Sequence, residues 1–413
     1  MKAGTKFFMI KGLCITKILF CRFACKKSYI QILVLAIALG SCKEDNSSPG
    51  EPPVNLVPPY AWNTFCMGAD LSYVNELEDY GAVYRDSSVV KDPFTILKSH
   101  GANTVRVRLW HNPQWVAAIT GGKVYSDLSD AEKTISRAKA LGMAVVLDIH
   151  YSDEWADASH QSKPVAWEGI SFGALKDSVY TYTCHVMNYL AGKGLMPEMV
   201  QLGNELNGGM FYPDGKVVND NWQLFGELLN EGIRAVRDVS AGSVIKPLVI
   251  LHVAQLQNAE WWIGKVMANA KVTDFDIVGL SHYSKWTTVK TMKGVEDVVR
   301  HVAYLTGKRV MIVETAYPWT TVDADNYTNL VSGADTIPGY PITKGGQFNY
   351  FKDLVQALIN GGGSGVIYWE PAWITSPMPD LWGTGSPWDN VTLFDSDGML
   401  LPAADYMQTT YLF

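Results

Sequence analysis

The feature that most constrains the fold of this chain is a regular alternation between short apolar runs and longer amphipathic segments. From Thr64 onward, apolar runs end in polar residues, amphipathic stretches follow, and most of these end in glycine before the next run. Segment 172–192 has a clear helical pattern, because its apolar residues recur on one face: Leu175, Val179, Tyr182, Val186 and Leu190. The apolar runs occupy residues 64–70, 103–110, 143–150, 198–205, 247–253, 275–283, 309–315 and 364–373.

This alternation predicts an α/β fold of the (β/α)8 TIM-barrel type, formed by a single domain over residues 61–413. Doubly wound sheets usually have fewer strands. Glycine-rich turns follow the helices here, so the run 361–363 is interpreted as a helix stop and not as a phosphate-binding loop. The predicted helices between the runs cover 94–101, 131–142, 172–192, 222–239, 258–270, 295–307 and 348–363.

Two of the predicted strands end in a glutamate. "VQLGNELNGGM" places Asn204 and Glu205 directly after an apolar run, and "VMIVETAYPW" places Glu314 in the same way. A buried carboxylate costs desolvation energy unless another group compensates for it. In a barrel both side chains lie at the C-terminal mouth, where they can face one pocket. Two carboxyl groups without metal ligands suit glycoside hydrolysis, although any barrel of this size carries some acids at its mouth.

Other strand ends carry residues that suit a sugar site. The Asn204 amide can bond a sugar hydroxyl, and Arg106 and Arg108 alternate along one strand, so both point the same way. One of these arginines can hold a carboxylate ionised and lower its pKa. Further strand ends contribute His150, Tyr283 and Trp369, and aromatic rings suit stacking against sugar faces. The alternative interpretations are a core tryptophan at 369 and a structural ion pair at Arg108.

The N-terminal region is typical of an exported lipoprotein. A basic start and an apolar run ending in Leu-Gly-Ser-Cys predict a signal peptide over 1–41 and lipidation at Cys42, with an ordinary secretory signal as the alternative. Segment 42–60 is polar and proline-rich, so it is expected to be a flexible tether. The predicted location is the outer membrane, at the cell surface. In the predicted mature body only Cys66 and Cys184 remain, and both are expected to be free, buried thiols.

Composition excludes some partners. The formal net charge is −7 and the isoelectric point is about 5.6, which argues against nucleic acid as a ligand. No Cys/His cluster has zinc spacing, and the first run, "GADLS", lacks the His-x-His of metal-dependent barrel hydrolases. The chain is expected to act as a monomer and to need no cofactor for catalysis.

Seven ordered stretches give the chain a specific resemblance. It resembles the endo-β-1,4-galactanases of glycoside hydrolase family 53 over roughly residues 68–407. The stretches are "GADLSYV", "VRVRLWHNP", "LDIHYSDEWADASHQSKPVAW", "VQLGNELNGGM", "IVGLSHYSKW", "IVETAYPWT" and "VIYWEPAWI". The resemblance implies a retaining glycosidase of β-1,4-galactan, with Glu205 as general acid/base and Glu314 as nucleophile. It also implies a set of substrate-binding residues: Asn204, Arg108, Trp110, His150, Asp153, Trp155, Tyr283 and Trp369.

The chain departs from the family pattern at several points. His282-Tyr283-Ser284 stands where the family usually has Tyr-Tyr-Pro, and "AQLQN" replaces the usual turn after the fifth strand. Some family members bind calcium through Asp-x-Asp-x-His-x-Asn after the seventh strand. Here Asp323, Asp325 and Asn329 match this motif, with Tyr327 in the histidine place, so the loop is a candidate site for a structural calcium ion.

Two other functional hypotheses stay open on the sequence. One is a β-mannanase or cellulase with the same pair of glutamates. The other is a glycan-binding surface lipoprotein without catalysis, which would be expected to lose one glutamate, whereas this chain keeps both.

Overall fold

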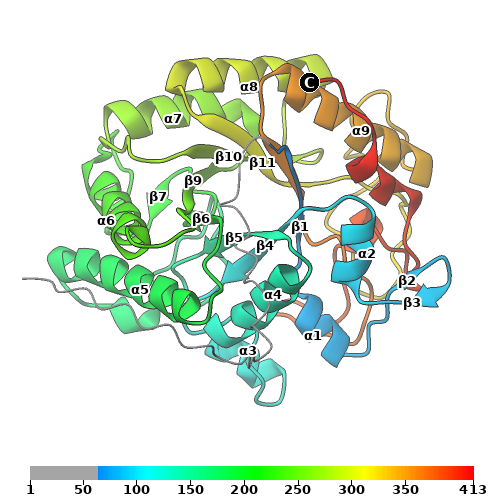
Figure 1. Cartoon of the computed structure of the whole chain (residues 1–413), viewed down its shortest axis with the longest axis horizontal. Coiled ribbons are helices and arrows are strands. Elements are labelled where there is room, and N and C mark those ends of the chain that lie inside the picture. The colour runs from blue at the N-terminus through cyan, green and yellow to red at the C-terminus, as the bar shows by residue number, and fades with distance from the viewer. Residues whose placement is uncertain (1–63) are drawn as a thin grey trace, which may run out of the picture. The chain divides into compact units, whose positions relative to one another are not determined.

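The strands form a closed parallel barrel in the computed structural model, which describes residues 64–413 (Figure 1). Their order around the barrel is β1-β12-β11-β10-β9-β6-β5-β4, and β4 pairs with β1 to close it. The strands are β1 (Cys66–Asp70), β4 (Thr104–Leu109), β5 (Ala144–Ile149), β6 (Met199–Leu202), β9 (Leu248–Val253), β10 (Ile277–Tyr283), β11 (Arg309–Ala316) and β12 (Gly365–Tyr368). The eight predicted runs are thus the eight barrel strands, and the predicted fold class is confirmed.

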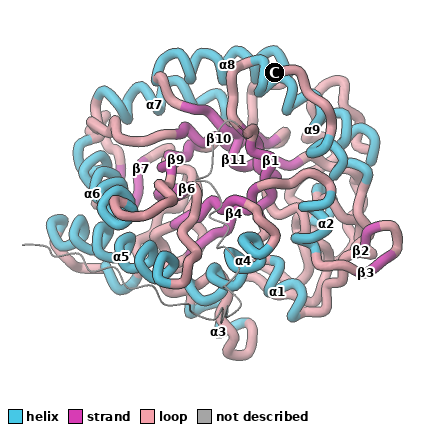
Figure 2. The backbone as a smooth tube through the Cα atoms, viewed as in Figure 1, coloured by secondary structure: helices cyan, strands magenta, loops and turns pink. Residues whose placement is uncertain are grey.

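Helices surround this barrel (Figure 2). The connecting helices are α2 (Pro93–Ser99), α4 (Leu128–Ala140), α5 (Phe172–Gly192), α6 (Gln223–Ser240), α7 (Ala259–Ala268), α8 (Met292–Thr306) and α9 (Lys344–Asn360). Several begin at a side chain that accepts a backbone N–H of the first turn, as Ser171 does for Ala174 and Thr343 does for Gly346. Helix α5 has the bounds predicted from its periodicity.

Short elements fill the loops. They are α1 (Val74–Asp79), α3 (Gln114–Ile119), the pair β2 (Arg85–Asp86) and β3 (Val89–Val90), and the pair β7 (Gly209–Met210) and β8 (Gly215–Lys216). Four 3₁₀ segments occur among the described residues: Val165–Trp167, Leu256–Asn258, Asp389–Val391 and Pro402–Gln408.

The eighth outer position is occupied by the 3₁₀ segment Pro402–Gln408 and not by an α-helix. Its Tyr406 ring stacks on Phe351 of α9, with 4.8 Å between ring centroids. On the other side, a Cβ at Gly101, just after α2, would lie 2.6 Å from the Met407 carbonyl oxygen. The segment therefore packs between α9 and the end of α2, and it closes the ring with a shorter element.

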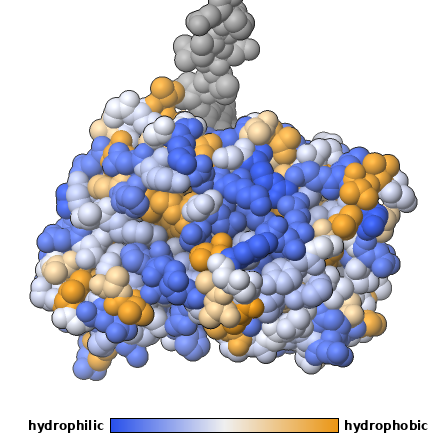
Figure 3. Space-filling view, turned by 90° about the horizontal axis from the view of Figure 1, so that it is seen from below, coloured by the Kyte–Doolittle hydropathy of each residue, from blue (hydrophilic) through white to orange (hydrophobic). Residues whose placement is uncertain are grey.

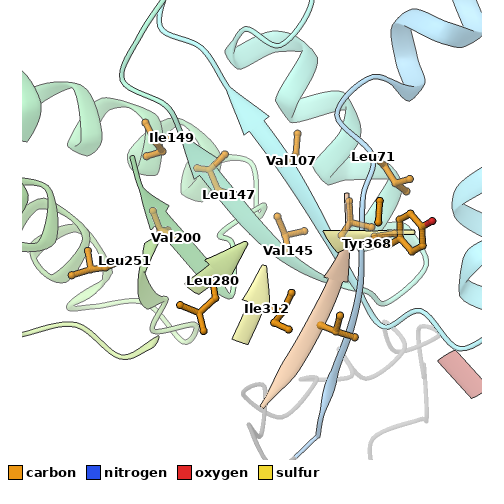
Figure 4. Close-up of a cluster of buried hydrophobic side chains, with 14 of the residues drawn as sticks. Leu71, Val107, Val145, Leu147, Ile149, Val200, Leu251, Leu280, Ile312 and Tyr368 are labelled. Atoms are coloured by element: carbon orange, nitrogen blue, oxygen red, sulfur yellow. The ribbon is translucent and has the colours of Figure 1, made fainter. Parts of the chain in front are cut away.

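Strand alternation divides the core into two parts. Side chains such as Val145, Leu147 and Ile149 of β5 point outward and pack under the helices (Figure 4). Residues between them point into the barrel, where a smaller apolar cluster fills the lower part: Cys66, Val146, Met199, Ile250, Ile277, Met311, Val313 and Ile367. Above this cluster the inward positions become polar, and they carry Arg106, Arg108, Asp148 and Gln201.

Outside the barrel, the surface in Figure 3 shows hydrophobic residues in small separate groups among polar ones. No helix in residues 64–413 is long and apolar enough to span a membrane. Cys66 and Cys184 are free thiols, which confirms that prediction, although Cys184 is partly exposed where a buried thiol was expected. The predicted signal peptide, lipidation site and tether lie outside the described residues.

Candidate active site

The two strand-end glutamates meet at one end of the barrel. Glu205 follows β6 and Glu314 lies within β11, and a carboxylate oxygen of each lies within 4.8 Å of the other. Two register shifts flank β11 near this point, one between Leu280 and Ser281 and one between Ile312 and Thr315. Glu205 has a φ of 47°, a left-handed conformation that is unusual for a residue with a side chain. Such strain is common where a side chain must be aimed at a reaction centre.

Glu314 has a cation and a phenol as partners. Arg106 of β4 donates to its Oε1 at 2.8 Å, and the Tyr283 hydroxyl donates to its Oε2 at 3.0 Å. Arg106 also donates to Asp70 at 2.7 Å and to Asp148 at 2.8 Å, so one buried guanidinium serves three carboxylates. Arg106 is therefore the arginine that supports the carboxylate form of Glu314.

Glu205 accepts hydrogen bonds from two neutral groups. The Ser281 hydroxyl donates to its Oε1 at 2.6 Å, and the Ala158 backbone N–H lies 3.4 Å from its Oε2. Burial raises the pKa of the Glu205 carboxyl above its ordinary value, while the Ser281 hydrogen bond lowers it. Burial also raises the pKa of Glu314, to about 8, and there the Arg106 guanidinium lowers it while the Glu205 charge raises it.

These environments assign the proton within the pair. Two carboxyl groups this close titrate together, and near neutral pH one of them keeps a proton. The charged form of Glu314 gains a guanidinium and a phenol, whereas the charged form of Glu205 gains a serine hydroxyl. The proton therefore belongs on Glu205, and once Glu205 is neutral its charge no longer raises the pKa of Glu314.

A pocket of about 450 Å³ opens over the two glutamates. Among the predicted sugar-binding residues, Asn204, Trp155, Tyr283 and Trp369 line it, together with Glu205 and Glu314. Two further tryptophans, Trp286 and Trp388, also line the pocket. Indole walls beside hydrogen-bonding groups suit a pyranose ring, which presents flat C–H faces and a polar rim.

Four predicted sugar-binding residues lie outside the pocket lining. Arg108 is buried under the wall, with its guanidinium 4.2 Å from the Trp155 ring centroid and its Nη1 3.5 Å from Glu370. Trp110 is also buried, and Arg108 lies 4.4 Å from its ring centroid. Arg108 thus forms a buried ion pair with Glu370, as the alternative interpretation proposed. Arg106 and Arg108 both point inward from β4, but they lie at different depths in the barrel.

His150 and Asp153 hold their surroundings in place. His150 contacts Asp148 at 2.9 Å through Nε2, and its Nδ1 lies 3.3 Å from the Ala156 backbone N–H. Asp153 lies 3.3 Å from His111 and accepts the Val165 backbone N–H at 2.8 Å. Both residues therefore support the loop that carries Trp155, without lining the pocket themselves.

Three buried residues that contact the pair and its neighbours were not singled out from the sequence. Ser281 contacts Glu205, His252 contacts Ser281 at 2.8 Å, and Gln201 contacts His252 and Asn204 at 3.1 Å each. A sequence signal was present, since each is a polar residue inside an otherwise apolar strand. Among residues 64–413, one group of three potential metal ligands converges: Glu205, His252 and Glu314. These side chains already have hydrogen-bond partners in the site, as His252 has in Asn204.

The candidate calcium residues take part in hydrogen bonds within and between loops. Asp325 accepts the Tyr327 N–H at 2.7 Å, the Thr375 hydroxyl at 2.6 Å and the Ser386 N–H at 2.8 Å. Asn329 turns its amide Nδ2 toward both Asp323 and Asp389, each at 2.8 Å, and not its oxygen. Asn329 Oδ1 is a buried oxygen without a hydrogen-bond partner among the described residues, and a structural calcium ion at this loop stays a prediction.

Comparisons with known proteins place these features in a family. The family model for glycosyl hydrolase family 53 matches residues 66–407. An arabinogalactan endo-β-1,4-galactanase of Cellvibrio japonicus is 41% identical over 352 residues, covering 84% of this chain and 91% of the relative. An endo-β-1,4-galactanase of Bacillus subtilis is 35% identical over 380 residues, covering 83% of this chain and 85% of the relative.

A solved structure agrees with these matches. The family 53 catalytic domain of Ignisphaera aggregans superimposes with a TM-score of 0.76 at 34% identity, covering 84% of this chain and 96% of that domain. The family match spans all eight strands and both strand-end glutamates. The chain therefore belongs to glycosyl hydrolase family 53.

Proposed function

We propose that this glycoside hydrolase is a retaining endo-β-1,4-galactanase that cuts the galactan side chains of pectin. The observation that carries the mechanism is the closeness of the two carboxyl groups, since one oxygen of Glu205 lies within 4.8 Å of one oxygen of Glu314. Retaining enzymes hold their carboxyls about 5–5.5 Å apart, and inverting enzymes about 6.5–9.5 Å, to leave room for a water. The substrate class follows from the relatives, several of which are named endo-β-1,4-galactanases.

In the first step Glu314 attacks the anomeric carbon of a bound galactose. Its carboxylate oxygen forms a bond to C1 while the bond from C1 to the glycosidic oxygen breaks, and Glu205 gives its proton to that oxygen. Arg106 and Tyr283 hold the nucleophile in place through the two oxygens of its carboxylate.

In the second step water replaces the enzyme at C1. Glu205, now a carboxylate, takes a proton from water as the water oxygen bonds to C1, and the bond between C1 and Glu314 breaks. Glu205 is then protonated again and Glu314 is free, so the cycle closes. Two inversions at C1 leave the product with the β-configuration of the substrate.

A substrate panel tests the assignment. Linear β-1,4-galactan, β-mannan and cellulose are incubated separately with the protein, and the released oligosaccharides are separated and identified. We expect cleavage of galactan into short oligomers and little release from the other two. Comparable rates on mannan would contradict the galactanase assignment and leave the glycosidase chemistry intact.

We also propose that the protein is an outer-membrane lipoprotein exposed at the cell surface, anchored through Cys42. Supporting this are the basic start, the apolar run and the Leu-Gly-Ser-Cys sequence. In cells fed a labelled fatty acid, the wild-type protein should carry label, and the Cys42→Ala variant should not. Equal labelling of both proteins would contradict lipidation at this cysteine.

A further inference from the structure

The general acid/base has two buried polar neighbours that the proposed reaction does not use directly. We infer that Ser281 and His252 form a closed hydrogen-bonded clamp on Glu205 that positions its carboxyl group and stabilises the carboxylate form. This inference rests on the proposed role of Glu205. Ser281 and His252 are positioning residues here, since neither lines the pocket.

The clamp runs from the side chain of Glu205 back to its own backbone. The Ser281 hydroxyl donates to Glu205 Oε1 at 2.6 Å. His252 Nε2 lies 2.8 Å from Ser281 Oγ, and His252 Nδ1 lies 3.3 Å from the Glu205 backbone nitrogen. Ser281 and His252 are both fully buried, so water does not compete for these contacts.

The positions of the hydrogens follow from the donors. When the Ser281 hydroxyl hydrogen points at the Glu205 carboxylate, Ser281 Oγ can only accept from His252, so Nε2 carries a hydrogen. In the neutral ring Nδ1 is then an acceptor, and it faces the Glu205 N–H and the Gln201 Nε2, which lies 3.1 Å away. Asn204 Oδ1, itself an acceptor, lies 2.9 Å from the same Nδ1 and is bonded only when Nδ1 carries the hydrogen. When Glu205 is protonated the chain therefore runs the other way: the Glu205 hydroxyl donates to Ser281, Ser281 donates to His252 Nε2, and Nδ1 donates to Asn204 Oδ1.

The surroundings keep His252 neutral. Burial lowers the pKa of His252 well below its ordinary value, and Arg106 and His150 lower it further, while Asp148 raises it. Because its pKa is lowered in this way, the ring does not take up the proton of Glu205. The imidazole thus orients the serine hydroxyl and leaves the acidic proton on Glu205.

The clamp meets two needs of Glu205. The backbone of this residue is left-handed, and the bond from its N–H to His252 Nδ1 helps to hold that conformation. Its side chain changes charge twice in each cycle, and the Ser281 hydrogen bond is a direct partner for the charged state. Around the same carboxyl lie Asp157, whose charge raises its pKa, and Arg106, whose charge lowers it. Glu314 faces it across the pocket.

The direct test is an NMR titration of Glu205 in protein labelled with ¹³C at the glutamate side-chain carboxyl carbon. The Glu205 signal is assigned by its absence in Glu205→Gln. Removing a hydrogen bond to the charged form raises a carboxyl pKa, so Ser281→Ala should raise the pKa of Glu205. Ser281→Thr, which keeps the hydroxyl, should leave it near the wild-type value.

Two further variants separate positioning from general damage. Ser284→Ala removes a buried hydroxyl without a hydrogen-bond partner three residues away, so it should leave the Glu205 titration unchanged. As a single variant, His252→Gln should raise the pKa of Glu205. In the Ser281→Ala background it should add nothing to that rise, because His252 acts on the carboxyl through Ser281. An unchanged Glu205 pKa in Ser281→Ala, or additive shifts in the double variant, would overturn the clamp.

The kinetics of Ser281→Ala on galactan give a second readout. Ser281→Ala should lower kcat about 10- to 100-fold on a substrate whose leaving group needs protonation, with little change in KM. Formation of the glycosyl-enzyme from an activated aryl glycoside should slow much less. The NMR titration needs no substrate, so a failure of the galactanase assignment would appear in the substrate panel and would leave the test of the clamp in force.

Discussion

At the scale of single residues, Arg106 is the cation that balances the negative charges of three carboxylates in the site. It is fully buried and donates to Asp70, Asp148 and Glu314, which come from three other strands. Burial opposes the ionisation of Asp148, yet Arg106 and His150 lower its pKa below the ordinary value. Taking away the guanidinium would leave this buried charge without its main partner, and such a loss is costly.

Arg106→Gln is therefore expected to lower the free energy of unfolding by about 3–5 kcal/mol at neutral pH. Without the cation the folded-state pKa values of its carboxyl partners rise, so the deficit should shrink as pH falls and these groups are protonated. Urea unfolding at several pH values measures this. Arg300→Gln is the control, because Arg300 pairs with Glu296 at the surface and should cost about 0–1 kcal/mol. A deficit in Arg106→Gln that is equally small, or independent of pH, would contradict the account.

The two glutamates should respond differently to replacement. Glu205→Ala should lose about 10²- to 10⁴-fold in turnover of galactan, and much less on an aryl glycoside whose leaving group needs no proton. Added azide should speed this variant, since the small anion can attack the glycosyl-enzyme without a general base. Glu314→Ala should be inactive on every substrate, because it lacks the nucleophile. The reverse pattern would exchange the two roles.

The pH profile follows from the same pair. Activity needs Glu314 ionised and Glu205 protonated, so it should fall on the acid side as Glu314 gains a proton and on the alkaline side as Glu205 loses one. Burial raises the pKa of both groups, so the midpoints of both limbs should lie at a pH above the ordinary glutamate pKa of about 4.3. Initial rates on galactan between acid and alkaline pH measure the limbs. An alkaline limb that persists unchanged in Glu205→Ala on the activated substrate would contradict the assignment.

At the scale of elements, the loops after β11 and β12 hold each other through hydrogen bonds. Asp325 of the first loop accepts from Thr375 and Ser386 of the second, and the Tyr327 hydroxyl donates to Asp380 at 3.0 Å. A Cβ at Gly385 would lie 2.4 Å from Asp325, so this approach requires glycine. The same loops supply Leu330 and Trp388 to the pocket wall.

The stability of these loops should therefore depend on Asp325. Asp325→Ala is expected to lower Tm by several degrees, because about 1 kcal/mol corresponds to roughly 2–4 °C in a domain of this size or somewhat smaller. If the loop holds a calcium ion, a chelator should lower the Tm of the wild-type protein, and an unchanged Tm would remove the calcium site. Asp177→Ala, at an exposed helix position, is the control and should have little effect. A fall in Tm with chelator that calcium restores would show that an ion joins these loops.

The elements also show what the sequence can and cannot predict. All eight strands followed from the apolar runs between amphipathic segments, and the bounds of α5 followed from its helical periodicity. The 3₁₀ segment Pro402–Gln408 could not be predicted, since its place depends on contacts with α9 and the end of α2. Likewise, Arg106 and Arg108 share a face as expected, but which of them meets Glu314 depends on the register between strands. Ser281 and His252 stand out as polar residues within apolar strands, but their contact with Glu205 depends on the same register.

At the scale of the whole molecule, the site exists only because the barrel is closed. Arg106 comes from β4, His252 from β9, Ser281 and Tyr283 from β10 and Glu314 from β11. These residues are far apart in the sequence, and parallel pairing brings the same ends of all strands together. The central claim is that this arrangement sets the two carboxyl groups close enough for direct attack on the sugar.

Proton NMR of the first products released from galactan tests this claim most directly. The anomeric signal of the new reducing end is followed within the first minutes, before mutarotation mixes the two forms. One oxygen of each glutamate lies within 4.8 Å of the other, which is the close spacing of retaining enzymes, so the first product should be the β-anomer. A first product in the α-form would contradict the account, because Glu314 would then act as a base through a water molecule.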